Sequence, residues 1–220
     1  MISGLLSDKQ LWHHQVSHLS HIATIQVVSP SQNTQEKMVQ TILEKAPPKF
    51  ALAGHSMGGW LALEVMKVAP SRVTKLCLLN TTALPDPEEK RNDRQEMILK
   101  TEQGKFGEVV QDLASKLVFN SVAKDSVEKM FMCVGEEVFI NQQESMLQRN
   151  ECLSILPSIP CPTLVIHAAK DQLFSLEEHY RWVDQIQGAK LAIIEDSGHM
   201  SPVEMPQAVT ALMRFWLAYF

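Results

Sequence analysis

Residues 50 to 60 read Phe50-Ala51-Leu52-Ala53-Gly54-His55-Ser56-Met57-Gly58-Gly59-Trp60, an order that predicts a buried strand, a tight turn and the start of a helix. Glycines stand two residues before and two residues after Ser56, where a Cβ would obstruct the close approach of a strand and a helix. The pattern Gly-x-Ser-x-Gly indicates a nucleophile elbow, which presents a serine hydroxyl at a helix N-terminus. A serine that only caps the helix is the simpler alternative, so its partners have to be sought elsewhere in the chain.

The composition bounds the domain count and the kind of partner. The chain has 220 residues, of which 45% are hydrophobic, and this favours one core with an insertion over two separate domains. The formal net charge is -5, and Lys and Arg are scattered along the sequence. A basic face for nucleic acid or for an anionic membrane is therefore not expected, and a small-molecule partner is.

The cysteines and the apolar runs indicate the compartment. Cys77, Cys133, Cys152 and Cys161 form no Cys-x-x-Cys pair, so we interpret them as reduced packing residues and expect no metal site. No run approaches the roughly 18 apolar residues of a membrane span, and the N-terminus lacks a signal pattern. The sequence thus predicts a cytoplasmic, soluble protein.

Apolar runs alternate with helical patterns along the chain. Helical spacing covers residues 35–45, and capping boxes begin at Ser175 and Ser201. The alternation predicts an α/β fold with a doubly wound, mostly parallel sheet of about six strands and a site at the carboxyl ends of the strands. The six predicted strands lie within residues 1–6, 22–28, 50–53, 73–79, 163–168 and 191–194.

The alternation breaks between the fourth and fifth predicted strands. From about Leu84 to Pro157 the sequence shows helical patterns only. We interpret residues 84–157 as a helical cap inserted into a core of residues 1–83 and 158–220. Most of its apolar side chains are expected to pack within the cap, and some to face a substrate. The four predicted helices cover residues 93–101, 106–119, 126–134 and 136–148.

A serine nucleophile needs a base to accept its proton and an acid to orient the base. Of the eight histidines, only His199 follows a predicted strand directly, on a loop that Gly198 allows to turn sharply. Asp171 follows the fifth predicted strand in the same way, and Asp196 is the next candidate for the acid. The order serine, aspartate, histidine is the one expected for a fold with this elbow.

Three motifs in this order resemble those of the α/β-hydrolase superfamily, in particular its capped, esterase-like members. The resemblance implies that the backbone amides of Leu5 and Met57 form an oxyanion hole, with Ser3 in place of the histidine that is usual in the family. Because the given sequence begins almost at this loop, the resemblance also implies a sheet without the first two strands of the family. The motifs are Gly54-His55-Ser56-Met57-Gly58-Gly59, Pro162 to Ile166 leading to Asp171, and Ser197-Gly198-His199.

The predicted function is a serine hydrolase that cleaves an ester or thioester of a small, partly apolar acid through an acyl-enzyme intermediate. Ser56 would attack the carbonyl, His199 would transfer the proton and Asp171 would orient His199, and no cofactor is implied. Two alternatives stay open. One is a carbon-carbon bond hydrolase or another acyl-transfer enzyme with the same triad, and the other is a binding protein on the same fold without turnover. The oligomeric state is left open.

Overall fold

Four parallel strands form the central sheet of the computed structural model, which describes residues 1–220. They lie in the spatial order of the chain, so each neighbouring pair requires a crossover connection, and helices supply it. The predicted parallel α/β sheet is thereby confirmed. The strands are β1 (Phe50–His55), β2 (Val73–Leu79), β3 (Thr163–Ala168) and β4 (Lys190–Ile194).

The prediction of about six strands was wrong, because the two N-terminal apolar runs meet the sheet at single positions only. Ile2 forms isolated parallel bridges with Val28 and with Gly54, and neither run continues as a strand. The first run turns away at Leu6, whose φ is +52°. The second run is followed by Pro30, which has no amide hydrogen for a strand ladder. The two runs are therefore a bridged edge beside β1.

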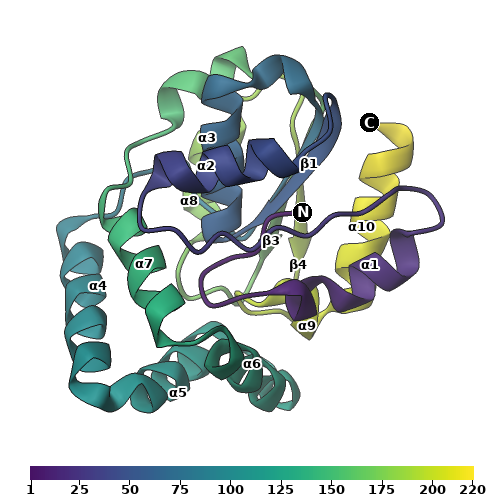
Figure 1. The fold of residues 1–220 in the computed structure, drawn as a ribbon. Helices are drawn as coiled ribbons and strands as arrows, with labels where there is room; N and C mark the ends of the chain where they lie inside the picture. The colour runs from purple at the N-terminus through teal and green to yellow at the C-terminus, as the bar shows by residue number, and fades with distance from the viewer.

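Helices cover both faces of the sheet (Figure 1). One face carries α2 (Gln35–Lys45), α3 (Met57–Val68) and α8 (Leu176–Val183), and the other carries α1 (His13–Leu19) and α10 (Pro206–Tyr219). The short helix α9 (Ser201–Glu204) precedes α10. Short helical turns complete the connections: η1 (Lys9–Trp12), η2 (Pro70–Arg72) and η4 (Leu153–Ser158).

The two faces of the sheet carry two separate core clusters, because side chains of a strand point alternately to opposite faces. Leu78 of β2 packs in the same cluster as Trp60 of α3. Cys77 and Leu79 of the same strand belong to the other cluster, together with Trp216 of α10. All five side chains are buried, so the alternating apolar pattern of one strand holds three layers together.

Four helices follow β2 and gather at one end of the molecule (Figure 1). Their bounds follow the predicted helical patterns, but α4 and α6 begin earlier than predicted. The start of α6 is fixed by Asn120, whose Oδ1 accepts a hydrogen bond of 3.1 Å from Val122 N. The four-helix segment, as we call it, consists of α4 (Glu88–Lys100), α5 (Phe106–Leu117), α6 (Ser121–Val134) and α7 (Glu136–Leu147), with the turn η3 (Thr101–Lys105) between α4 and α5.

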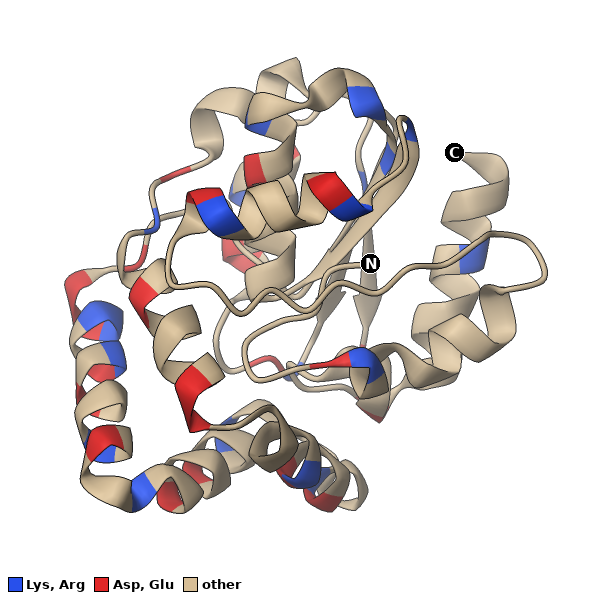
Figure 2. Ribbon diagram, viewed as in Figure 1, with Lys and Arg blue, Asp and Glu red and all other residues tan.

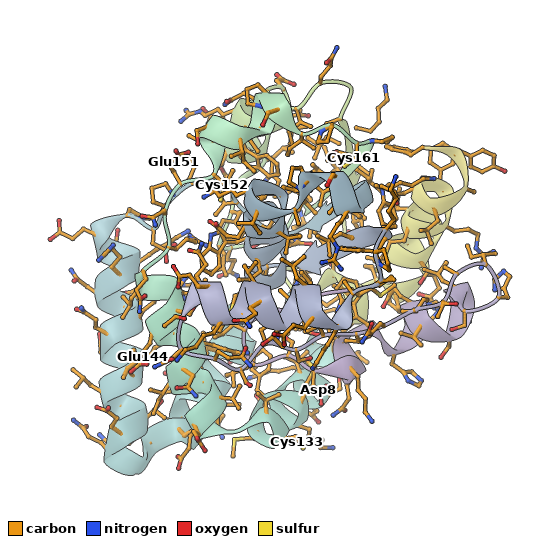
Figure 3. All side chains as sticks on the ribbon, turned by 45° about the horizontal axis from the view of Figure 1, so that its top comes forward. Asp8, Cys133, Glu144, Glu151, Cys152 and Cys161 are labelled. Carbon is orange, nitrogen blue, oxygen red and sulfur yellow. The ribbon has the colours of Figure 1, made fainter.

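The four cysteines are free thiols. Cys77, Cys152 and Cys161 are buried, and Figure 3 shows the exposed Cys133 far from Cys152 and Cys161. Burial raises the pKa of Cys152 to about 12 and that of Cys161 to about 11, so both stay protonated. The Cys152 thiol donates to Glu64 Oε1 at 3.2 Å. None of the helices is both long enough and apolar enough to cross a membrane.

The turn between β1 and α3 brings backbone segments into direct contact. A Cβ on Gly54 would lie 2.1 Å from the carbonyl oxygen of Gly58, and a Cβ on Gly58 would lie 2.4 Å from the carbonyl oxygen of Ile2. Both positions therefore require glycine. Between them, Ser56 has φ 54° and ψ -120°, a conformation that few residues with a side chain adopt.

Gly54→Ala is expected to destabilise the protein by about 1–3 kcal/mol or more, because the new methyl group would collide with backbone atoms that cannot move aside. Gly107→Ala is the matched control, since a Cβ at this helical position of α5 would have no atom within 4 Å. We expect its free energy of unfolding to stay the same or to rise by up to about 1 kcal/mol. Denaturant unfolding of both variants is the measurement, and equal losses would contradict the steric account.

Candidate active site

Three side chains form a hydrogen-bonded line where three strands end. Ser56 follows β1, Asp171 follows β3, and His199 lies on the loop after β4. His199 Nε2 lies 2.8 Å from Ser56 Oγ, and His199 Nδ1 lies 2.8 Å from Asp171 Oδ2. An ionised carboxylate only accepts hydrogen bonds, so Nδ1 carries the proton. Nε2 is therefore free to accept a hydrogen bond from the serine hydroxyl. The structure thus brings together the three side chains that the sequence singled out.

Asp171 is held in its ionised form. Its side chain is fully buried, which by itself would raise its pKa. The charge and hydrogen bond of His199 and the hydrogen bonds from Leu173 N (2.8 Å) and Asn80 Nδ2 (3.1 Å) outweigh burial and lower the pKa to about 2. Asp196, the other candidate acid, has an exposed position on its loop.

Asn80 is a polar contact that the sequence reasoning did not assign to the site. It ends β2 with φ 45°, and its side chain donates to Asp171 while its Oδ1 accepts from Ser201 Oγ at 2.7 Å. Ser201 was expected to cap the following helix, but the N-cap residue is Met200. The hydroxyl of Ser201 instead fixes the amide of Asn80, which in turn orients the carboxylate.

His55 supports the loop that carries His199. Its Nε2 lies 2.7 Å from the carbonyl oxygen of His199, and its side chain is buried. Burial and the neighbouring His199 lower the pKa of His55 to about 3, so its imidazole is neutral and donates this hydrogen bond from Nε2. Gly4 packs on the same side chain, since a Cβ there would lie 3.0 Å from His55 Nδ1.

A buried carboxylate joins the histidine loop to the four-helix segment. Glu204 Oε2 accepts hydrogen bonds from Gly198 N (3.2 Å), Phe119 N (2.8 Å) and Asn120 N (2.9 Å), and its Oε1 accepts from Met200 N (3.0 Å). Glu204 is the last residue of the capping box that the sequence predicts to begin at Ser201. The sequence did not reveal the bonds to Phe119 and Asn120, which are more than eighty residues away.

A cavity of about 240 Å³ opens over Ser56. Ten of its 22 lining residues are hydrophobic, so the cavity is only partly apolar. Leu113 and Leu117 of α5 belong to the lining, as expected of some apolar residues in this segment. The methionines at positions 130 and 132 do not, because Met130 is buried in the core and Met132 is exposed.

Leu5 and Met57, the expected oxyanion-hole residues, both line this cavity. Met57 is the first residue of α3, where backbone amides have no partner within the helix. The loop that carries Leu5 is held by Gln142 of α7, whose Oε1 accepts from Leu6 N at 2.9 Å and whose Nε2 donates to Pro30 O at 2.7 Å. Gln142 was not foreseen, because it stands 136 residues from Leu6.

Comparisons with known proteins agree with this architecture. A model of the alpha/beta hydrolase family matches residues 18–212. The chain is 24% identical over 207 residues to a pimeloyl-[acyl-carrier protein] methyl ester esterase from Nitrosospira multiformis, with 82% of this chain and 73% of that protein covered.

Solved structures share the fold over nearly the whole chain. A thermophilic esterase from Thermogutta terrifontis has a TM-score of 0.87 at 24% identity, covering 98% of this chain and 87% of its own. An enol-lactonase from Burkholderia xenovorans has a TM-score of 0.84 at 20% identity, covering 98% of this chain and 90% of its own. At these identities the likeness establishes the fold and leaves the substrate open.

Glu204→Gln is expected to lower the free energy of unfolding by about 1–3 kcal/mol, since an amide has one acceptor oxygen for four N–H groups, of which those of Gly198 and Met200 are buried. Glu128→Gln is the matched control, because Glu128 makes only a 3.6 Å contact with Lys124 at the surface and such pairs contribute little. Urea unfolding of both variants is the measurement. A Glu204 variant as stable as the control would show that the four bonds do not hold the loop.

Proposed function

Because the chain belongs to the alpha/beta hydrolase family, we propose that it is a serine hydrolase that cleaves an ester or thioester of a small, partly apolar acid. One observation carries the proposal: the hydrogen-bonded line from Ser56 through His199 to the ionised Asp171, below a cavity large enough for a small acyl group. The name of the Nitrosospira multiformis relative describes the cleavage of a methyl ester. It supports a carboxylic ester as the bond that is cleaved.

In the first half of the proposed reaction, Ser56 Oγ attacks the carbonyl carbon of the substrate while its proton moves to His199 Nε2. Asp171 stays ionised and stabilises the imidazolium that forms. The negative charge that develops on the carbonyl oxygen is stabilised by the backbone amides of Leu5 and Met57. Collapse of the tetrahedral intermediate expels the alcohol or thiol, which takes the proton from His199.

In the second half, water repeats these steps on the acyl-enzyme. His199 Nε2 accepts a proton from the water, whose oxygen attacks the carbonyl carbon bonded to Ser56 Oγ. The same two amides stabilise the second tetrahedral intermediate, which then releases the acid and returns the proton to the serine. All groups needed are side chains or amides of this chain, and no cofactor takes part.

The proposal includes a cap formed by residues 84–157 over a core of residues 1–83 and 158–220. The support lies in the cavity lining, to which α4 and α5 of the four-helix segment contribute residues such as Met97 and Leu113. A lining of this kind excludes water from part of the site, which strengthens the electrostatic interactions inside it.

Ser56→Ala, His199→Ala and Asp171→Asn are each expected to lower kcat by about 10⁴-fold or more while the protein stays folded. The losses should not add in the triple variant, because the three residues act as a unit and the oxyanion hole leaves a residual rate. Aryl ester turnover is the measurement, together with labelling by a fluorophosphonate probe. A wild-type protein that takes up no probe at Ser56 would instead be the binding protein without turnover.

The rate should depend on one ionisation on the acid side. His199 has to be neutral to accept the serine proton, so kcat/KM is expected to fall as the pH drops below neutral. Asp171 cannot account for this fall, because its pKa of about 2 keeps it ionised throughout the range. A pH profile of kcat/KM on an aryl ester is the measurement, and a rate that stays flat down to about pH 4.5 would exclude His199 as the base.

A further inference from the structure

Three cationic side chains line the cavity over Ser56 at its less exposed positions. Lys90 and Arg94 come from α4, and Arg149 follows the end of α7. Arg149 is only 5% exposed, and the side chain of Arg94 is 14% exposed. At the rim the charges are mixed and solvated, as in the exposed pair of Lys100 with Glu96. Figure 2 shows both signs along α4. The lining takes both signs from this helix, but its acidic residues there, Asp93 and Glu96, are exposed.

The buried charges do not balance. Asp86 is a buried carboxylate in the lining, and it accepts from both Arg94 Nε (2.6 Å) and Arg149 Nη2. Glu178 also attracts Lys90, but it bonds the hydroxyl of Thr82 and does not line the cavity. Counting Glu178, two carboxylates therefore face two guanidinium groups and an ammonium group in a partly desolvated space, where like charges repel strongly. The other carboxylates of the lining, Asp93, Glu96 and Asp112, are exposed to solvent.

The cations also have donors that the protein does not use. Arg149 Nε is buried without any hydrogen-bond partner, and Arg149 bonds Asp86 through Nη2 alone. Arg94 uses Nε for Asp86 and Nη1 for Gln143 Oε1 (2.7 Å), which leaves Nη2 without a protein acceptor. The unused Arg94 Nη2 can donate to a carboxylate in the cavity, and Arg149, whose Nε has no exposed surface, adds positive charge beside it.

These cations lie close to the reacting groups. Lys90 Nζ sits 4.8 Å from the centroid of the Phe174 ring, and the same ring lies 5.8 Å from the His199 ring. The Arg149 guanidinium lies 5.9 Å from the ring of Trp60, which is one helical turn after Ser56. Ser56 and the three cations line the same cavity, so a substrate with its carbonyl at Ser56 can extend a short chain toward the cluster.

We propose that the cavity selects esters or thioesters that carry a carboxylate a few carbons from the scissile carbonyl, held by Lys90, Arg94 and Arg149. This inference rests on the proposed function and names its substrate class. Charge-assisted hydrogen bonds in such a setting should favour the anionic substrate by about tenfold or more in kcat/KM. The preference should shrink at high ionic strength, because salt screens the attraction.

The test compares mono-4-nitrophenyl adipate with its neutral match, methyl 4-nitrophenyl adipate. A second pair, the butyrate ester of 4-hydroxybenzoic acid and that of its methyl ester, puts the carboxylate on the leaving group. We expect the wild type to prefer the anionic member of one pair, and that pair locates the carboxylate. The measured quantity is the ratio of kcat/KM for the anionic ester to kcat/KM for its neutral match. Lys90→Met and Arg94→Gln should bring this ratio close to one for the preferred pair. Arg91→Gln, an exposed position on the same helix outside the lining, should leave it unchanged.

The outcomes separate the inference from the function on which it rests. Hydrolysis without preference in either pair would overturn the carboxylate site and leave the serine hydrolase intact. A ratio that falls equally in Arg91→Gln would overturn it as well, because a general surface field would then suffice. If no substrate is turned over and no probe labels Ser56, the proposed function fails. Calorimetric binding of adipate to the wild type and to Arg94→Gln then tests the site alone, and equal affinities would overturn it.

Discussion

The close approach of Gly54 to Gly58 is the constraint on which the rest of the site depends. With no Cβ at either position, β1 can pass directly into α3, and Ser56 is held at a positive φ between them. The amide of Ser56 bonds the carbonyl oxygen of Leu79 at the end of β2, so the turn is anchored to the sheet itself. The serine side chain is thereby fixed relative to the ends of the other strands, where its partners lie.

The histidine loop lacks such a local constraint and is held by distant segments. Glu204 joins its amides to those of residues 119 and 120, and His55 bonds its carbonyl from the elbow. Asn80 does the same for the carboxylate of Asp171 from the end of β2. Contacts from both the sheet and the four-helix segment therefore orient the His199 imidazole. A loss of contact between them would directly change the orientation of this side chain.

The sequence predicted what depends on neighbours in the chain. β2 and β3 were located to the residue because they are short apolar runs between turn signals, and Ser56, Asp171 and His199 were found because each follows a strand. The long-range hydrogen bonds of Asn80, Gln142 and Glu204 were not predicted, since a polar residue shows no pattern that reveals a partner far along the chain. The N-terminal runs were assigned as strands because apolar character does not show how many residues of an edge find a pairing partner.

The charged part of the cavity lining was not predicted either. The sequence analysis expected some apolar residues of the predicted cap to face a substrate, and it did not single out α4, which lines much of the cavity and has no buried residue. Apart from Met97, which packs against a core cluster, α4 is attached mainly through polar contacts. For α4 these are the bonds of Arg94 to Asp86 and of Lys90 to the carbonyl oxygen of Leu173 (2.8 Å). The contacts that position this helix thus also give the cavity its charge. Under the proposed selection of a carboxylate, the attachment of α4 and the choice of substrate depend on the same side chains.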